Sequence, residues 1–450
     1  MPPLSPLDLP HDDPYGPHNL PYGVFTTPDA PDLRRIGVRY GDHVLDAGAA
    51  AAAVGSPHAA LLGHPTLNPL MAAGRSVWQA VREELRGWLT ESAHRSAIEP
   101  LLHPLTTVTL HLPFEVADYV DFYASEHHAS NVGRIFRPEG GPLTPNWKHM
   151  PIGYHGRAGT VVVSGTPVVR PRGQLRPPAG QAESAQPTSD QPTSDQPTSG
   201  QSAPAHSALP PFGPTRRLDF EAEVAFVVGA PSPFNTPVPL SGFHDHVFGV
   251  CLLNDWSARD IQSWEYRPLG PFLGKSFATS VAAWITPLDA LAAARTAPPA
   301  RDVPLLPYLD DSATTAAETA GDAETAGAAE PGGLDLRIEV AINGHPVSHP
   351  PFAAMYWTAA QQLAHMTVNG ASLRTGDLFA SGTVSGPEPD QRGCLLELTW
   401  SGRDPLRLPD GERTFLEDGD EVTLTAWAPG PGNNRVALGE VTGCVVPSTP

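Results

Sequence analysis

The residue types best suited to chemistry occur first in a short acidic segment, Leu218 to Val228. Acidic and apolar residues alternate there, so Asp219, Glu221 and Glu223 share one face of an extended strand. Adjacent carboxylates repel one another unless water or a cation compensates their charge. This segment alone is therefore compatible with either a solvated outer face or a metal site.

Two further carboxylates favour the metal site. Asp255 follows the apolar run Val247 to Leu253, where a strand would pass into a loop, and Asp121 lies in another short strand-like segment. Strand ends and loops are common positions for site residues. If both aspartates converge with Glu221 and Glu223, the four offer only oxygen ligands. Such a set suits Mg²⁺ or Ca²⁺ and not zinc.

Candidate bases are the adjacent histidines His127 and His128, which follow closely on Asp121. Histidine is the usual residue for taking a proton from water near neutral pH. The chain has 18 histidines, so an isolated histidine would carry little weight. Glu397 lies within the strand-like run Cys394 to Trp400, and a buried glutamate there needs a partner.

A candidate helix follows Asp255. Ser257, with Asp260 three residues later, is typical of a helix start. Helical spacing then places Arg259, Gln262 and Tyr266 in one row, which is either an exposed polar stripe or a functional face.

Lysine is rare in this chain. Of 28 basic residues, only Lys148 and Lys275 are lysines, and Lys275 follows a loop rich in glycine and proline. A solvated lysine is the ordinary interpretation, but a compact ammonium donor is a role that arginine does not fill.

The elements that must position these residues are mainly β-strands. The chain has 450 residues and 40% apolar composition, enough for at least two domains. Two short β segments, Tyr22 to Phe25 and Ile36 to Tyr40, predict a small N-terminal β domain, and the stretch from Asn68 to Leu89 predicts one amphipathic helix. Further strands are predicted at Val161–Val163, Phe220–Val228, His246–Leu253, Leu336–Ile342, Cys394–Trp400 and Val422–Trp427.

Bulk composition restricts the classes of partner. The net charge of -20 disfavours nucleic acid and anionic membranes, and no stretch has the length and apolarity of a signal peptide or a bilayer span. We therefore expect a cytoplasmic protein. Cys251, Cys394 and Cys444 are far apart and are expected to be packing residues. Residues 177–211 and 311–333 are low in apolar content and are predicted to be flexible insertions.

Several motifs together resemble the fumarylacetoacetase family. The resemblance covers almost the whole chain apart from the two insertions, and the block at 254–277 is the most specific. The motifs are HNLPYGVF at 18–25, DYVDFYASEHHASNVG at 118–133, PNWKHMPIGYHGR at 145–157, LDFEAEVAFVVG at 218–229, NDWSARDIQSWEYRPLGPFLGKSF at 254–277, MYWTAAQQLAHMTVNG at 355–370 and LFASGTVSG at 378–386.

The resemblance implies a mainly β fold: a small SH3-like N-terminal β-barrel in residues 1–117, then a mixed β-sandwich roll in residues 118–450, assembled as a homodimer. It implies hydrolysis of the β-diketo acid 4-fumarylacetoacetate to fumarate and acetoacetate, the last step of tyrosine and phenylalanine catabolism, with Mg²⁺ or Ca²⁺. The related alternatives are an acylpyruvate or fumarylpyruvate hydrolase and a non-catalytic metal-binding relative.

The resemblance also implies roles for individual residues. His128 matches the general base and Glu397 its orienting carboxylate, although the extra His127, where relatives have another residue type, is a second candidate base. The implied oxyanion donors are Arg259, Gln262 and Lys275. Metal ligation is implied for Asp121, Glu221, Glu223 and Asp255, with Lys275 and Thr279 near a further cation position. Substrate contact is implied for Tyr123, Arg137, Tyr154, Gln262, Tyr266 and Thr383.

Overall fold

The computed structural model describes residues 5–176, 209–310 and 332–449. The two predicted insertions, 177–211 and 311–333, lie outside the described residues except for their last few positions. Within the described part of the chain, no helix is long and apolar enough to cross a bilayer.

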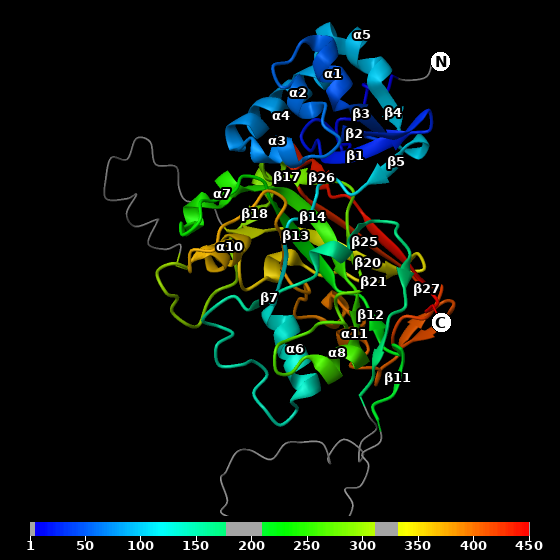
Figure 1. Ribbon diagram of the computed structural model, residues 1–450, viewed down its shortest axis with the longest axis vertical. Helices are drawn as coiled ribbons and strands as arrows, with labels where there is room; N and C mark the ends of the chain where they lie inside the picture. Colours follow the sequence, from blue (N-terminus) through cyan, green and yellow to red (C-terminus); the bar gives the residue numbers. More distant parts are fainter. Residues whose placement is uncertain (1–4, 177–208, 311–331, 450) are drawn as a thin grey trace, which may run out of the picture.

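The N-terminal region contains an antiparallel sheet of five strands in the order β4-β3-β2-β1-β5 (Figure 1). Both short β segments predicted here are confirmed, as parts of β1 and β2. The strands are β1 (Tyr22–Thr27), β2 (Ala30–Tyr40), β3 (His43–Asp46), β4 (Leu102–Pro104) and β5 (Thr109–His111).

Five α-helices lie between β3 and β4 in the sequence. They are α1 (Ala47–Val54), α2 (Ala59–Leu62), α3 (Asn68–Ala72), α4 (Arg75–Thr90) and α5 (Arg95–Ile98). The prediction of one continuous helix from Asn68 to Leu89 is wrong, because Gly74 interrupts it with a φ of 86°. This left-handed conformation cannot continue an α-helix and is readily adopted by glycine. Helix α4 keeps the predicted apolar face, which packs into the core.

The central element is a mixed sheet of eight strands, seven of them in the order β7-β6-β22-β13-β14-β16-β8, with β17 beside β14. The β22–β6 and β16–β8 pairs are parallel, and the other pairs are antiparallel. The strands are β6 (Tyr119–Phe122), β7 (Gly153–His155), β8 (Val161–Val163), β13 (Ala222–Val228), β14 (Val247–Asp255), β16 (Thr279–Val281), β17 (Thr286–Pro287) and β22 (Leu378–Ala380).

A second sheet of six strands has the order β21-β20-β25-β27-β9, with β26 beside β25. Its strands are β9 (Val168–Val169), β20 (Arg337–Ile342), β21 (His345–Ser348), β25 (Glu421–Pro429), β26 (Arg435–Ala437) and β27 (Val441–Val446). The strands predicted at Leu336–Ile342 and Val422–Trp427 are thus confirmed. So is the predicted fold class: mainly β, with an N-terminal β domain and a mixed β roll.

Several shorter elements lie outside the two large sheets. Two-stranded ladders are formed by β10 (Arg172–Gln174) with β11 (Phe212–Pro214), β12 (Leu218–Asp219) with β15 (Ser257–Ala258), β18 (Arg295–Thr296) with β19 (Gly333–Leu334), and β23 (Leu406–Leu408) with β24 (Gly411–Arg413). The other α-helices among the described residues are α6 (Glu126–Phe136), α7 (Phe243–His246), α8 (Arg259–Glu265), α10 (Ala359–Thr367) and α11 (Leu395–Leu398).

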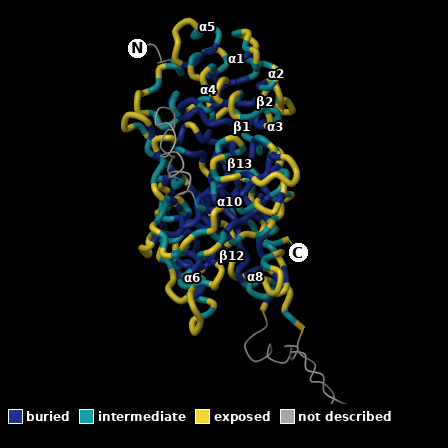
Figure 2. The backbone as a smooth tube through the Cα atoms, turned by 90° about the vertical axis from the view of Figure 1, so that its left-hand side faces the viewer, coloured by how far each residue is buried: buried dark blue, intermediate teal, exposed yellow. Residues whose placement is uncertain are grey.

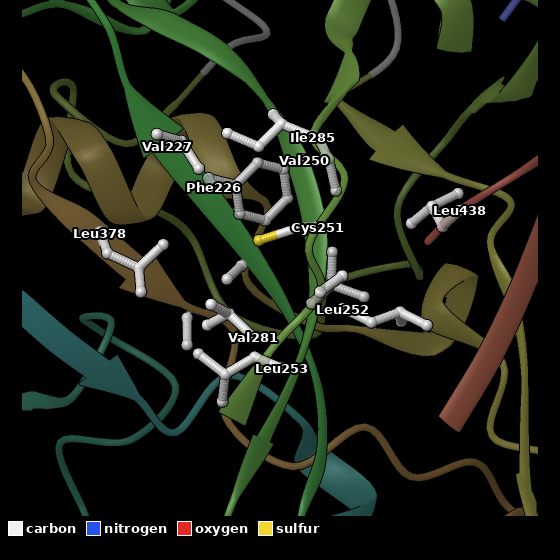
Figure 3. Close-up of a cluster of buried hydrophobic side chains, with 14 of the residues drawn as sticks. Phe226, Val227, Val250, Cys251, Leu252, Leu253, Val281, Ile285, Leu378 and Leu438 are labelled. Carbon is white, nitrogen blue, oxygen red and sulfur yellow. The ribbon is translucent and has the colours of Figure 1, made fainter. Parts of the chain in front are cut away.

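The hydrophobic core follows the central strands β13 and β14 (Figures 2 and 3). Every residue of β14 is buried, and Cys251 contributes its thiol to this apolar cluster. Phe226 of β13 stacks on Phe379 of β22 with ring centroids 5.3 Å apart. This packing makes β13 and β14 a rigid support. Acidic residues lie at one end of this support: Glu223 near the start of β13 and Asp255 at the end of β14.

One predicted strand is wrong. The segment Cys394 to Trp400 contains the short helix α11, and Trp400 and Ser401 then adopt positive φ values of 48° and 62°. Apolar runs of this length do not distinguish a strand from a buried helical turn, because both bury every side chain.

Candidate active site and metal centre

Four carboxylates converge at one end of β13 and β14. Asp121 comes from β6, Glu223 from β13, Asp255 from the last position of β14, and Glu221 from the link between β12 and β13. All four are buried, and each offers a ligand oxygen within 4.8 Å of the others. The strand register explains this meeting, since Glu223 pairs with Leu253, two positions before Asp255. The four carboxylates, whose convergence the sequence analysis left as a condition, therefore do lie together.

This carboxylate cluster has an unbalanced charge. Both carboxylate oxygens of Glu223, and Oδ1 of Asp121, are buried and have no hydrogen-bond partner in the part of the chain that the structure describes. Burial and the neighbouring carboxylates raise the pKa of Asp121 and of Glu223 well above the ordinary range. Buried carboxylates without partners are costly. A divalent cation with hard oxygen ligands fits this donor set, and these four residues would hold it.

Lys275 partly compensates the cluster from one side. Its Nζ lies 2.6 Å from Oδ2 of Asp255 and also contacts Glu221. Burial would lower the pKa of Lys275, but the carboxylates of Asp255 and Glu221 raise it, so the ammonium stays charged. Thr279 donates its hydroxyl to Oδ1 of Asp255 at 3.4 Å. Both residues therefore lie beside the cluster and contact Asp255.

Arg259 contacts the cluster from the other side. Its Nη1 donates to Oε1 of Glu221 at 2.6 Å and to Oε1 of Gln262 at 3.3 Å. Burial would raise the pKa of Glu221, but Lys275 and Arg259 hold it below its usual value. Arg259 is buried and Gln262 half-buried, whereas Tyr266 lies just beyond α8 and is 36% exposed. Of the predicted row, therefore, Arg259 and Gln262 lie at the site, whereas Tyr266 does not contact the carboxylate cluster within the described residues.

The predicted helix cap at Ser257 is wrong. Ser257 lies in β15, and its hydroxyl donates to the carbonyl of Asp255 at 2.9 Å. Helix α8 begins at Arg259 without a side-chain cap. Ser257 is not at the N-cap position because it is still paired with Asp219 in the β12–β15 ladder, and Ala258 directly precedes α8.

His128 and Glu397 form a buried pair. Nδ1 of His128 lies 2.6 Å from Oε2 of Glu397, and their exposed fractions are 4% and 0%. Asn131 and Ser385 donate to the same carboxylate at 2.9 and 2.8 Å. Burial would raise the pKa of Glu397, but His128 and these donors lower it to about 2. Glu397 is therefore ionised near neutral pH and orients the imidazole.

The neighbouring His127 has different surroundings. It is half-buried and lines a surface pocket of about 460 Å³ with Ser130 and Arg134. Only His128 of the two makes the contact with Glu397.

The sequence matches two family models. "Fumarylacetoacetate (FAA) hydrolase C-terminal" matches residues 118–446, and "Fumarylacetoacetase N-terminal" matches residues 18–113. The chain belongs to the fumarylacetoacetase family. Curated relatives named fumarylacetoacetase include those of Bos taurus (42% identity, 96% of each chain covered), Homo sapiens (41%, 99% of each) and Arabidopsis thaliana (41%, 99% of this chain and 98% of that protein).

A solved structure gives the same fold. The crystal structure of a putative HpcE protein from Mycobacterium smegmatis superposes with a TM-score of 0.50 at 20% identity, covering 95% of this chain and 99% of that one. At this identity the likeness concerns the fold alone.

The substrate-contact residues implied by the fumarylacetoacetase family differ in their proximity to the site. Tyr123 packs edge-on against His128, with ring centroids 5.3 Å apart, and the hydroxyl of Tyr154 lies 3.5 Å from Oδ2 of Asp255. Thr383 is buried, and its hydroxyl has no hydrogen-bond partner among the described residues. A hydroxyl without a partner is available to a ligand.

Two other residues implied by the fumarylacetoacetase family lie nearer the surface. Arg137, half-buried at the C-terminal end of α6, donates to the carbonyl of Pro142 at 3.3 Å. The ring of Tyr266 lies 5.2 Å from the guanidinium of Arg267. The structure thus brings Tyr123 and Tyr154 to the buried site, whereas Arg137 and Tyr266 lie nearer the surface.

Sequence reasoning missed three donors that hold Glu397: Asn131, Ser385 and the buried thiol of Cys394, which was expected only to pack and which donates to Oε2 at 3.2 Å. Asn131 lies three positions after His128 on α6, so helical spacing could have identified it. Ser385 comes from a loop far along the chain, and no local pattern marks it.

Gly133 of α6 provides a test of how this helix positions Arg137. A Cβ at this position would lie 1.8 Å from the carbonyl oxygen of Pro142, which accepts from Arg137. We expect Gly133→Ala to displace the 137–143 turn and to raise KM at least about fivefold, although Ala usually stabilises a helix by about 1 kcal/mol. Steady-state kinetics measure this effect.

The matched control for this prediction is Gly87→Ala in α4. A Cβ there meets only the Glu91 side chain, at 3.4 Å. This variant should keep the wild-type KM and be as stable as the wild type or more so. Equal KM values in the two glycine variants would contradict the proposed link between Gly133 and Arg137.

Proposed function

We propose that this protein hydrolyses 4-fumarylacetoacetate to fumarate and acetoacetate. Relatives about 40% identical over nearly their whole length are named fumarylacetoacetase. The observation that carries the proposal is the buried pair of His128 and Glu397 beside a cluster of carboxylates with a buried lysine. His128 is close enough to the cluster to lower the pKa of Glu221. Water activation and charge stabilisation are thus available in one place.

His128 is proposed as the base that takes a proton from water. Its Nδ1 faces Glu397, so Nε2 is the nitrogen left to accept that proton. The carboxylate of Glu397 stabilises the resulting imidazolium, in the manner of the base and orienting acid of a hydrolytic triad. The activated water then attacks the substrate carbonyl without a protein nucleophile, the carbon–carbon bond to the acetoacetate part breaks, and the imidazolium of His128 returns its proton to the departing enolate.

Stabilisation of the oxyanion is assigned to Lys275, Gln262 and Arg259. Their donors are held before substrate arrives: the lysine by Asp255 and Glu221, and the guanidinium by Glu221. A fixed donor in such a site commonly contributes about 3 to 4 kcal/mol to the transition state. The leaving group is an enolate carbanion, so Lys275 also supplies positive charge where charge develops.

We assign Asp121, Glu221, Glu223 and Asp255 to a divalent ion, Mg²⁺ or Ca²⁺, with Lys275 and Thr279 beside a further cation position. The unpartnered oxygens of Glu223 and Asp121 support this assignment. When bound, the ion supplies Lewis-acid polarisation of substrate oxygens. His127 is assigned no part in the reaction.

Binding of the substrate is assigned to Tyr123, Tyr154, Tyr266, Thr383 and Arg137. The forked guanidinium of Arg137 suits a substrate carboxylate. The hydroxyls of Thr383 and of the tyrosines suit its other oxygens, and Gln262 contributes an amide.

The decisive assay follows the loss of fumarylacetoacetate absorbance with purified protein, together with identification of fumarate and acetoacetate. Production of both compounds supports the proposal. No turnover of fumarylacetoacetate, with turnover of an acylpyruvate or fumarylpyruvate, would replace the substrate but keep the site. Turnover of none of these would favour a non-catalytic metal-binding relative.

Lys275 is predicted to be essential, and the chain offers a matched control. We expect Lys275→Met to lower kcat at least about a hundredfold, because it removes a fixed cationic donor. Lys275→Arg should rescue little, since a planar guanidinium does not replace the compact ammonium between two carboxylates. Initial rates with saturating substrate measure both effects.

The control is Lys148→Met, which alters the only other lysine. Lys148 pairs with Glu126 and Asp302 near the surface, each at 2.8 Å. Its variant should retain the wild-type kcat within about twofold, as expected for surface ion pairs. Equal losses in both variants would show a general charge effect and remove Lys275 from the mechanism.

We further propose a cytoplasmic homodimer built from domains 1–117 and 118–450. Size-exclusion chromatography with light scattering tests the assembly, and a single mass near 47.7 kDa would contradict it. Expression of each domain alone tests the division.

A further inference from the structure

Asp219 is a fully buried carboxylate that lies outside the carboxylate cluster of Asp121, Glu221, Glu223 and Asp255. It is two residues before Glu221, its exposed fraction is 0%, and it does not belong to the four-carboxylate group. Its neighbour in the β12–β15 ladder is Ser257. A buried carboxylate requires strong compensation. The groups that compensate Asp219 belong to two different parts of the site.

On one side, Asp219 holds Arg259. Oδ2 of Asp219 accepts from Nε of Arg259 at 2.8 Å and lies 2.7 Å from Nη2. Because Nη1 of the same guanidinium contacts Glu221, Arg259 is fixed between two carboxylates. Guanidinium groups held along one edge keep a defined plane. Asp219 therefore sets the orientation of a proposed oxyanion donor.

On the other side, Asp219 holds helix α11. Oδ1 accepts from the backbone N–H of Leu395 at 2.7 Å, and Oδ2 from that of Leu396 at 3.0 Å. These are the first two N–H groups of α11, which have no partner within a helix. A helix of four residues does not form without such contacts. Glu397 is the next residue, so Asp219 also sets the backbone from which Glu397 reaches His128.

We infer that Asp219 is a positioning residue that fixes the oxyanion donor Arg259 relative to the pair of His128 and Glu397. Each of its oxygens accepts from at least two donors, since Oδ1 also accepts from the N–H of Phe220 at 2.8 Å. Both groups thus share one anchor. Catalytic geometry tolerates errors of only a fraction of an ångström, so loss of the anchor should affect the chemical step more than substrate affinity. This inference rests on the proposed function.

The test is Asp219→Asn, which keeps the size of the side chain but presents an amide to Arg259 or to the α11 backbone. We expect kcat to fall at least about tenfold and KM to change less than about threefold. A merely structural role would lower thermal stability without this split between kcat and KM. A variant with wild-type kcat would overturn the inference.

The matched control is Asp420→Asn. Asp420 is also buried, with an exposed fraction of 2%, and pairs with Arg413 at 2.9 Å. It lies just before β25, and neither residue contacts the carboxylate cluster or Glu397 in the described structure. This variant should lose stability but keep kcat within about twofold. Equal loss of kcat in both would show a nonspecific effect of a broken buried pair and overturn the inference.

A double-mutant cycle with Arg259→Lys tests the route of the effect. If Asp219 acts through Arg259, adding Asp219→Asn to Arg259→Lys should lower kcat by less than it does in the wild type, because the oriented fork is already lost. Fully additive losses would overturn the proposed link to Arg259.

A second variant covers the case in which Asp219→Asn does not fold. Asp219→Glu keeps the charge but shifts the carboxylate by one methylene, so kcat should again fall while KM is retained. Wild-type kcat in Asp219→Glu would overturn the inference. An inactive wild-type protein would count against the proposed function instead, whereas an active wild type with fully active Asp219 variants counts only against this inference.

Discussion

Chelation of divalent ions is expected to abolish turnover, and added Mg²⁺ or Ca²⁺ to restore it. Asp121, Glu221, Glu223 and Asp255 each place a carboxylate oxygen within 4.8 Å of the others, and two buried side-chain cations, Lys275 and Arg259, pair with this cluster. Without an ion, burial raises the pKa of Glu223 and Asp121, so protons compete for the ligand oxygens. Activity after dialysis against chelator, and after titration with each ion, measures the effect.

The same ion should contribute to stability. A ligand that binds only the folded protein stabilises it by about 2.7 kcal/mol when its concentration is a hundred times Kd. Thermal unfolding should therefore shift to higher temperature as the ion is added. The control is chelator saturated with ion beforehand, which should leave both rate and Tm unchanged. Full activity after exhaustive chelation, with no metal found by elemental analysis, would contradict the metal assignment.

Replacement of His128 by alanine is expected to lower kcat by about 10² to 10⁴, the usual contribution of a general base. Its imidazole is the group that Glu397 holds at 2.6 Å. In the wild type, His128 and the donors Asn131 and Ser385 lower the pKa of the buried Glu397 to about 2, so this carboxylate is ionised and orients the imidazole while His128 takes the proton. Single-turnover rates, together with KM, separate the chemical step from binding.

The control is His127→Ala, which changes the preceding residue on the same helix. His127 is half-buried and faces a surface pocket, so kcat should stay within about twofold. His128→Asn serves as a second variant, because an amide can still donate to the buried Glu397. If His127→Ala caused the larger loss, the base would be reassigned; near wild-type rates in both His128 variants would exclude His128 from the proton transfer.

Much of the fold was predictable because strand patterns are local. Segments such as Val247–Leu253 and Val422–Trp427 are apolar or alternate with period two, and these patterns fit a strand regardless of distant contacts. The errors have local causes as well. Gly74 divides α3 from α4 through its positive φ, and the apolar run around Glu397 contains one helical turn.

The acidic residues of the carboxylate cluster were recognisable from residue type, but the geometry of the cluster was not. Alternation placed Glu221 and Glu223 with Asp219, although Asp219 serves Arg259 and α11 and lies outside the cluster. The three are separated because β12 ends at Asp219 and β13 begins only at Ala222, so the alternation is interrupted. Such a break depends on pairing with β15 and β14, which are strands from a later part of the sequence.

The wide spacing of the site residues along the chain has a consequence for biosynthesis. Asp121 and Glu397 are more than half the chain apart, and the loop that carries Ser385 and the helix that carries Glu397 are made late. Contacts between such distant segments form slowly, because long loops must close first. A nascent chain released before α11 therefore lacks Glu397, the residue that orients the proposed base. On refolding, activity should accordingly recover later than the circular-dichroism signal of the β-sheets. The time course of activity would then report when α11 and the Ser385 loop reach His128.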